Sequence, residues 1–196
     1  MSALVSSLAF VGGFVIMSFE LLGGRMLAPY FGGSIHVWGS IITVFMASLA
    51  LGYLAGGRWS LRSPSLAKFA ALFLAGAGLL YPLAYFSEAA MNWIFHAIED
   101  PRYGSLAASM LLFVPPTVML GMISPYAVRL LVRTTEESGS IAGRLYFTST
   151  AGSALGTLGT SFYFVLWWEI NTILAMLTAA LVLAGATALA VAGMRK

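Results

Sequence analysis

The chain has 196 residues, of which 60% are hydrophobic and only 9% are charged, and its formal net charge is +3. The apolar residues come in runs of about 20, the length that crosses the hydrocarbon core of a bilayer as a helix, so a water-soluble globular domain is excluded. The absence of cysteine excludes disulfides and thiolate metal sites. The basic residues lie in short connections between apolar runs and give no argument for binding nucleic acid.

The apolar runs predict one all-α membrane domain over residues 1–196, embedded in the lipid bilayer, with six transmembrane helices. The predicted spans are 3–22, 37–57, 67–86, 104–127, 143–166 and 172–193. Eight of the ten Lys and Arg residues fall on one side of this arrangement, with only Arg25 and Arg102 on the other. Because cytoplasmic loops are enriched in Lys and Arg, both termini are predicted to be cytoplasmic.

The first predicted span carries the carboxylate of Glu20 and then meets Gly23-Gly24-Arg25. A carboxylate at membrane depth costs several kcal/mol unless it is paired, hydrated or protonated. In one unbroken helix, residues 20 and 25 lie about 140° apart around the axis, so they meet only if the glycine pair opens the helix. Glu20 and Arg25 are therefore candidate binding residues, either with each other or with partners from other helices.

The connection between the first two spans, residues 28–38, is too apolar for a free loop. Tyr30, His36 and Trp38 in this connection carry rings of the kind that settle at a membrane interface. We therefore expect a packed or re-entrant segment, and these three residues join the candidate binding residues.

Two spans carry glycines at a spacing typical of close helix contacts. These are Gly52 and Gly56 in the second span and Gly152 and Gly156 in the fifth. Packing within this subunit is the favoured interpretation of the first pair. The fifth span is also rich in Ser and Thr, so it is expected either to pack among other helices, which is favoured, or to face a hydrated path.

A helix is predicted outside the spans, over residues 88–100 between the third and fourth. Four apolar residues there recur at the spacing of one helix face: Met91, Ile94, Phe95 and Ile98. The segment is therefore predicted to be an amphipathic helix lying on the outer face of the membrane.

The two halves of the chain resemble each other. Arg25-Met-Leu and Ala50-Leu-Gly-Tyr-Leu match Arg129-Leu-Leu and Ala154-Leu-Gly-Thr-Leu at one ungapped offset, and residues 70–77 resemble residues 179–186. Three spans repeated once reverse their orientation between the copies, which is the inverted-repeat architecture of secondary transporters. The sequence therefore predicts a 3+3 inverted repeat in which Arg25 and Arg129 are pseudo-equivalent.

Four stretches resemble the membrane-spanning part of bacterial proteins in which a major-facilitator-like region is joined to a spermidine-synthase-like domain. They are Phe19–Ser34, Leu51–Arg58, Pro116–Pro125, and Gly143–Tyr146 continuing to Gly152 and Gly156. The resemblance implies one half of a major-facilitator fold in the bacterial inner membrane. It adds Arg144, Tyr146 and Ser149 to the candidate binding residues, although the family usually has Asn where Ser149 stands.

The glycine-rich nucleotide loop and aspartate pair of the family's soluble half have no counterpart in this chain. We find no Ser/His/Asp set and no cluster with metal-ligand spacing either, so neither catalysis by this polypeptide alone nor a cofactor or metal is expected.

The leading interpretation is a transporter-like protein that binds or moves a small cationic, polyamine-like solute. Because six spans are half of a usual twelve-span pore, a homodimer or a partner subunit is expected. The alternative is a membrane anchor or interaction subunit for a separate spermidine-synthase-like protein or a larger membrane complex. A third interpretation is a membrane-embedded enzyme component that takes its cofactor from such a partner.

Overall fold

The computed structural model describes residues 1–194, and every regular element in that range is a helix. The prediction of an all-α protein is therefore confirmed. In chain order the elements are α1 (Ser2–Phe31), α2 (Ile35–Ser60), α3 (Leu66–Leu80), α4 (Leu83–Ala97), α5 (Pro101–Gly121), α6 (Ile123–Leu131), α7 (Ser138–Gly159), the π-helix η1 (Thr160–Phe164), α8 (Val165–Trp167) and α9 (Ile170–Gly193).

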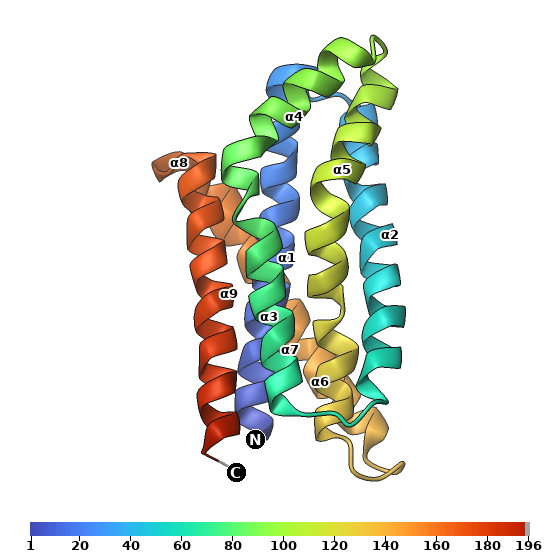
Figure 1. Cartoon of the computed structure of the whole chain (residues 1–196), viewed down its shortest axis with the longest axis vertical. Coiled ribbons are helices and arrows are strands. Elements are labelled where there is room, and N and C mark those ends of the chain that lie inside the picture. Colours follow the sequence, from blue (N-terminus) through green and yellow to red (C-terminus); the bar gives the residue numbers. More distant parts are fainter. Residues whose placement is uncertain (195–196) are drawn as a thin grey trace.

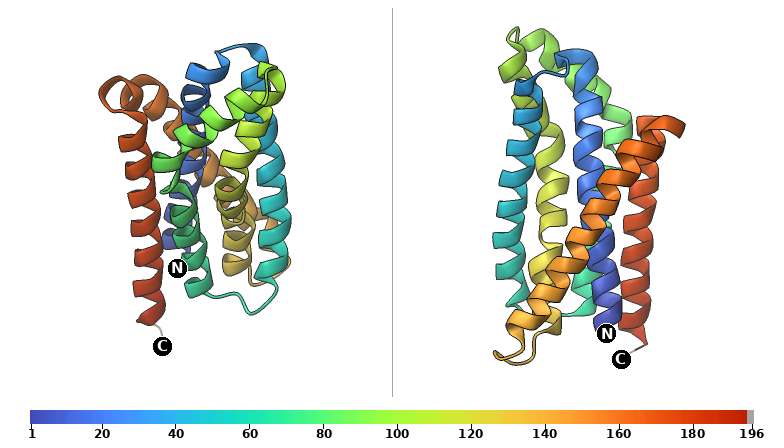
Figure 2. Two further views of the ribbon diagram at one scale, coloured as in Figure 1. Left: turned by 45° about the horizontal axis from the view of Figure 1, so that its top comes forward. Right: turned by 180° about the vertical axis from the view of Figure 1, so that it is seen from behind.

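The helices run back and forth along the long axis of an elongated molecule (Figure 1). The described chain begins and ends at the same end, which we call the termini end, while α4 and α8 lie toward the other, which we call the α8 end (Figures 1 and 2). Helix α1 leads from the termini end to the α8 end and α2 returns. The direction then alternates through four further units, which are α3 together with α4, α5 together with α6, α7 alone, and α9 alone.

Several of these helices are long and apolar enough to cross a membrane. Four candidates stand alone: α1, α2, α5 together with α6, and α9. Helices α3 and α4 form a fifth if they are counted as one span that bends by 50°. Helix α7 is not among the candidates, because its Ser, Thr and Gly residues lower its hydropathy. The residues described therefore provide four or five candidate spans, against the six predicted.

Three helix pairs make the most extensive contacts: α1 with α7, α2 with α5, and α3 with α9. Glycine permits two of these contacts. A Cβ atom on Gly52 of α2 would lie 2.5 Å from the main-chain oxygen of Val118, and one on Gly156 of α7 would overlap the main-chain oxygen of Phe14. Gly56 and Gly152 are just as close to facing main chain. The predicted close helix contacts are therefore confirmed, and they lie within one chain.

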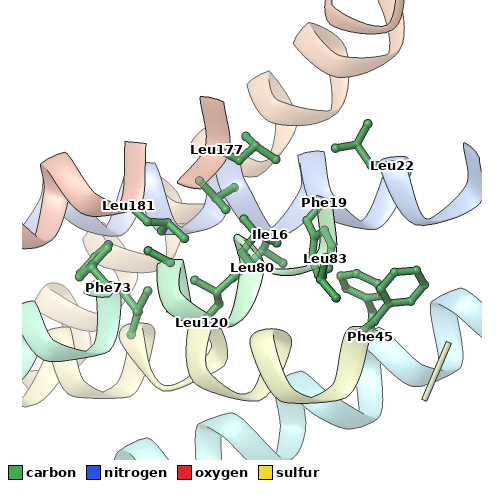
Figure 3. Packing of buried hydrophobic residues seen from close by; sticks show 14 of the residues in the cluster. Ile16, Phe19, Leu22, Phe45, Phe73, Leu80, Leu83, Leu120, Leu177 and Leu181 are labelled. Atoms are coloured by element: carbon green, nitrogen blue, oxygen red, sulfur yellow. The ribbon is translucent and has the colours of Figure 1, made fainter. Parts of the chain in front are cut away.

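Aromatic and leucine side chains fill the space between the pairs. The ring of Phe19 on α1 lies 5.5 Å from that of Phe45 on α2 and 5.4 Å from that of Phe113 on α5, measured between centroids. Leu80, Leu120 and other side chains of α3, α5 and α9 continue the core along α1 (Figure 3). This apolar packing fixes the positions of the helices that carry the polar residues described below.

A packed or re-entrant segment was predicted for residues 28–38, and the structure does not form the re-entrant one. Helix α1 continues without a break through Gly23-Gly24 and past Pro29 to Phe31, and only residues 32–34 separate it from α2. Gly32 ends α1 with a φ of +78°, a conformation that glycine adopts without steric cost. Most of the apolar residues in this connection are therefore helical.

The predicted helix over residues 88–100 exists but begins earlier. Helix α4 starts at Leu83, directly after a break at Tyr81-Pro82 that bends it by 50° from α3. Met91 and Ile94 of the predicted apolar face are buried, while the Phe95 side chain is 45% exposed. The segment is therefore the bent continuation of α3, which the apolar pattern alone did not show.

Candidate functional site

A cavity of about 350 Å³ lies between α1, α2, α6 and α7. No charged side chain lines it, and one part of its wall is apolar, formed by Ile16, Met17 and Leu49. We call it the hydroxyl cavity, because six of its lining residues carry a hydroxyl group: Tyr53, Ser124, Tyr146, Ser149, Thr150 and Ser153.

The helix termini and breaks around this cavity follow from local sequence. Helix α5 ends at Gly121 and α6 begins at Ile123, and Pro125 on α6 lacks the N–H that would donate to the Gly121 carbonyl. On the opposite wall, Gly13 brings α1 into direct contact with the main-chain oxygen of Ser149 on α7. From this contact α7 crosses α1 obliquely (Figure 2, right). The cavity lies beside this crossing and the proline-containing turn.

Most of the cavity hydroxyls have no protein partner. Ser153 donates a hydrogen bond to the Gly13 carbonyl at 3.2 Å. The other five hydroxyls form no hydrogen bond with any group in residues 1–194. By contrast, Thr148 on the same helix donates to the Arg144 carbonyl at 2.8 Å, so its hydroxyl is satisfied by the main chain. Unpaired hydroxyls at membrane depth are costly unless water or a polar solute meets them.

Glu20 lies next to this cavity along α1. It comes three and four residues after Met17 and Ile16, which line the cavity, so it occupies the same helix face one turn further on. One turn beyond it, the Trp38 ring lies against Gly24, where a Cβ atom would be 2.7 Å from Cη2. Glu20 is half-buried and has no hydrogen-bond or ion-pair partner in the described range 1–194. It is a carboxylate without a counter-ion in the middle of a candidate span.

Arg25 is not that counter-ion. Because α1 is unbroken at the glycine pair, Arg25 lies on a different face from Glu20. Its Nη1 donates to the Val165 carbonyl at 2.9 Å. The other pseudo-equivalent arginine, Arg129, is exposed in the last turn of α6 near the termini end. The structure therefore places neither arginine in an ion pair with Glu20.

The remaining predicted residues fall in separate places. Arg25 and Tyr30 line a cavity of about 510 Å³ at the α8 end, whereas Tyr146 and Ser149 share the hydroxyl cavity. Arg129 and Arg144 line two different cavities at the termini end. His36 is exposed in the first turn of α2. Of the nine predicted residues, the structure therefore brings together only Arg25 with Tyr30 and Tyr146 with Ser149. Trp38 contacts Gly24, one helical turn from Glu20.

Four of the six hydroxyl residues were not among the predicted site residues: Tyr53, Ser124, Thr150 and Ser153. The sequence carried a signal for Thr150 and Ser153, because both lie at helical spacing from Tyr146. Tyr53 and Ser124 had no such signal. They reach the cavity from α2 and α6, and only the packed structure brings those helices beside α7.

Within residues 1–194, no three His, Asp or Glu side chains converge in a way that could hold a metal ion. The fold and the cavity define an all-helical protein with several candidate membrane spans and an unpaired carboxylate beside a hydroxyl-lined cavity. Comparison with known proteins adds nothing more specific, since no family model, no curated protein and no solved structure matches the chain.

Proposed function

We propose that the protein is a transporter-like membrane protein that binds a small cationic solute at Glu20 and the hydroxyl cavity. The observation that carries this proposal is the absence of a counter-ion for Glu20 in the described residues. Because an uncompensated carboxylate is costly in a membrane span, it is retained where it binds something positive. The cavity adds no second charge, so the solute meets a net charge of −1.

The chemistry of the walls narrows the class of solute. An ammonium group donates hydrogen bonds to a carboxylate and to hydroxyl oxygens, and it is also attracted to the faces of Tyr rings. Tyr53 and Tyr146 offer both ring and hydroxyl. The wall formed by Ile16, Met17 and Leu49 suits methylene groups. A polyamine-like alkylammonium ion, with apolar and hydrogen-bonding parts, combines these properties.

The proposal includes six membrane crossings, which are the five candidates above and α7, the fifth in chain order. Helix α7 runs lengthwise like the candidate spans (Figure 2), and one of its polar faces lies on α1 and the cavity instead of lipid. A polar helix is tolerated in a membrane where it lies against protein or a hydrated space. The orientation proposed is that of the sequence prediction, with both termini on the cytoplasmic side of a bacterial inner membrane.

A repeated contact supports the proposed 3+3 inverted repeat. Gly52 of α2 lies against the Val118 carbonyl of α5, and Gly156 of α7 lies against the Phe14 carbonyl of α1. An offset of 104 residues separates Gly52 from Gly156, and the same offset separates Phe14 from Val118. One contact therefore recurs with the two halves of the chain exchanged. An inverted repeat of this kind suits alternating access to a site at its centre.

We further propose that a second copy covers the open side of the hydroxyl cavity. Helices α2 and α7 border that side, and both expose large apolar residues, among them Leu54 at 60% and Phe147 at 75%. Single cysteines at exposed Leu54 or Leu155 are expected to crosslink two copies in membranes, whereas one at Leu183 on α9 is not. Crosslinking only at Leu183 would contradict this arrangement.

The alternative, a membrane anchor or interaction subunit, is favoured by the same exposed face of α7, which a different protein could also cover. The two functions differ in what they require of Glu20. A subunit that only holds a partner keeps that partner when Glu20 becomes Gln, because charge plays no part in covering an apolar face.

Titration calorimetry of the purified protein with 1,4-diaminobutane tests the proposed function. Glu20→Gln is expected to lower the number of diamines bound per chain, because the site at Glu20 loses a charge-assisted hydrogen bond and binds about tenfold or more weakly. Glu136→Gln, an exposed substitution at the termini end, is the control. If Glu20→Gln leaves both the affinity and the number of diamines bound per chain unchanged, Glu20 is not a binding residue.

A further inference from the structure

The cavity at the α8 end has walls of a different chemistry. It measures about 510 Å³, is open on one side, and is lined by α1, α4 and the segment that joins α8 to α9. Two carboxylates line it, Glu88 from α4 and Glu169 from the residue before α9. In residues 1–194 neither carboxylate has a hydrogen-bond or ion-pair partner.

The one cationic side chain in this cavity is already engaged. Arg25 donates to the Val165 carbonyl at 2.9 Å, so it is held toward the end of η1 and forms no ion pair with Glu88 or Glu169. With one guanidinium and two carboxylates, the lining has a net charge of −1. A cation entering the cavity is therefore attracted, and an anion must approach two unpaired carboxylates.

Aromatic rings complete the walls. Trp168 is 43% exposed, and its ring centroid lies 5.7 Å from that of Phe164 in an edge-on arrangement. Tyr30 packs its ring against Phe95 and donates its hydroxyl hydrogen to the Glu88 main-chain oxygen at 3.4 Å. Both rings are thus held in place on the cavity wall. Fixed aromatic faces beside carboxylates are the surroundings that bind ammonium groups.

We propose that this cavity is a binding site for a small organic cation with one or two ammonium groups. A metal ion is a poorer fit, because no group of three His, Asp or Glu side chains that could hold one occurs in residues 1–194. An uncharged apolar ligand would bury two carboxylates without neutralising either. An ammonium ion matches the carboxylates, the rings and the amide oxygen of Asn171.

This site is separate from the one proposed at Glu20 and does not depend on it. Glu20 and Arg25 lie on different faces of α1, and Glu20 does not line the α8-end cavity. Changes at Glu88 and Glu169 therefore leave the hydroxyl cavity intact. The two proposals can fail independently.

The experiment uses the full chain in lipid nanodiscs, with Glu20→Gln as the parent so that the other proposed site is disabled. Titration calorimetry with 1,4-diaminobutane and butylammonium is expected to show binding, and 1,4-butanediol is expected to show none. Glu88→Gln and Glu169→Gln are each expected to weaken diamine binding about tenfold, because each removes a charged acceptor. Glu99→Gln, at the same end but outside the cavity, is the matched control.

A variant at a different lining residue tests the same site in case a Glu variant folds poorly. Trp168→Leu, in which both carboxylates remain, is expected to weaken binding of both amines about threefold to tenfold through loss of the ring. The proposal is overturned if the parent binds neither amine, if butanediol binds as well as the diamine does, or if the Glu88, Glu169 and Trp168 variants all bind like the Glu99 control.

Discussion

The Arg25 guanidinium on α1 donates a hydrogen bond to the main-chain oxygen of Val165, at 2.9 Å across 140 residues of chain. Val165 follows directly on the π-helix η1, where the backbone pattern of α7 changes before the chain turns into α9. The wider π-helical turn alters the spacing of main-chain acceptors. Arg25 therefore ties the α8 end of α1 to the segment that carries Trp168 and Glu169.

Arg25→Gln is expected to loosen this connection. The shorter amide does not reach as far, so the Val165 carbonyl loses a charged donor, worth about 1 kcal/mol at an exposed position. The expected result is a thermal midpoint in detergent that falls by a few degrees. Arg102→Gln is the control, because the side chain of Arg102 forms no hydrogen bond or ion pair within residues 1–194. Equal midpoints for the two variants would show that the bond adds no stability.

The glycine contacts give a second prediction. Gly52→Leu and Gly156→Leu are expected to destabilise the protein by about 2–3 kcal/mol or more, because the facing main chain of Val118 and Phe14 cannot retreat. The control is Gly57→Leu, since a Cβ at Gly57 meets nothing within 4 Å. Thermal unfolding in detergent measures all three. If Gly57→Leu unfolds as early as the other two, close packing at Gly52 and Gly156 does not explain the loss.

The sequence predicted those features of the fold that depend on residues close together in the chain. Runs of apolar residues gave the positions of the main helices, and the spacing of Gly52 and Gly56 gave a close contact that the structure confirms. The bend at Tyr81-Pro82 and the continuation of α1 past Pro29 were not predicted. Proline in a membrane protein can end, bend or sit within a helix, and packing around it decides which.

The candidate sites depend on residues far apart in the chain, and this is why they were predicted only in part. Arg25 and Tyr30 were identified, but Glu88 and Glu169 join them only after α4 bends over α1 and the chain turns between α8 and α9. No pattern of neighbouring residues indicates that these four side chains line one cavity. Glu20 was recognised from its cost in a span, a property of one residue and its immediate sequence.

The proposed topology predicts which ends of the molecule are accessible. The protein has no cysteine, so single cysteines report cleanly. In intact cells, a membrane-impermeant thiol reagent is expected to label Glu99→Cys, near the α8 end, and to leave Glu136→Cys, in the connection before α7, unlabelled until the cells are opened. Both side chains are exposed, so access to the bulk solvent is not limited by packing. The reverse labelling pattern would mean that the Lys and Arg distribution was wrongly interpreted.

The last prediction separates the two roles that Glu20 can have. Because Glu20 is half-buried with no counter-ion in residues 1–194, replacing it by the neutral Gln removes an unfavourable charge from a candidate span. Glu20→Gln is therefore expected to hold or raise the thermal midpoint while it weakens diamine binding. Glu20→Gln combined with Arg25→Gln is expected to show the sum of the two single effects, since the side chains lie on different faces of α1 and share no partner. A structural ion pair would give the opposite pattern: each single variant would be destabilised and the double variant would recover, because neutrality is restored. Such recovery would make Glu20 a structural residue and remove the main support for cation binding at the hydroxyl cavity.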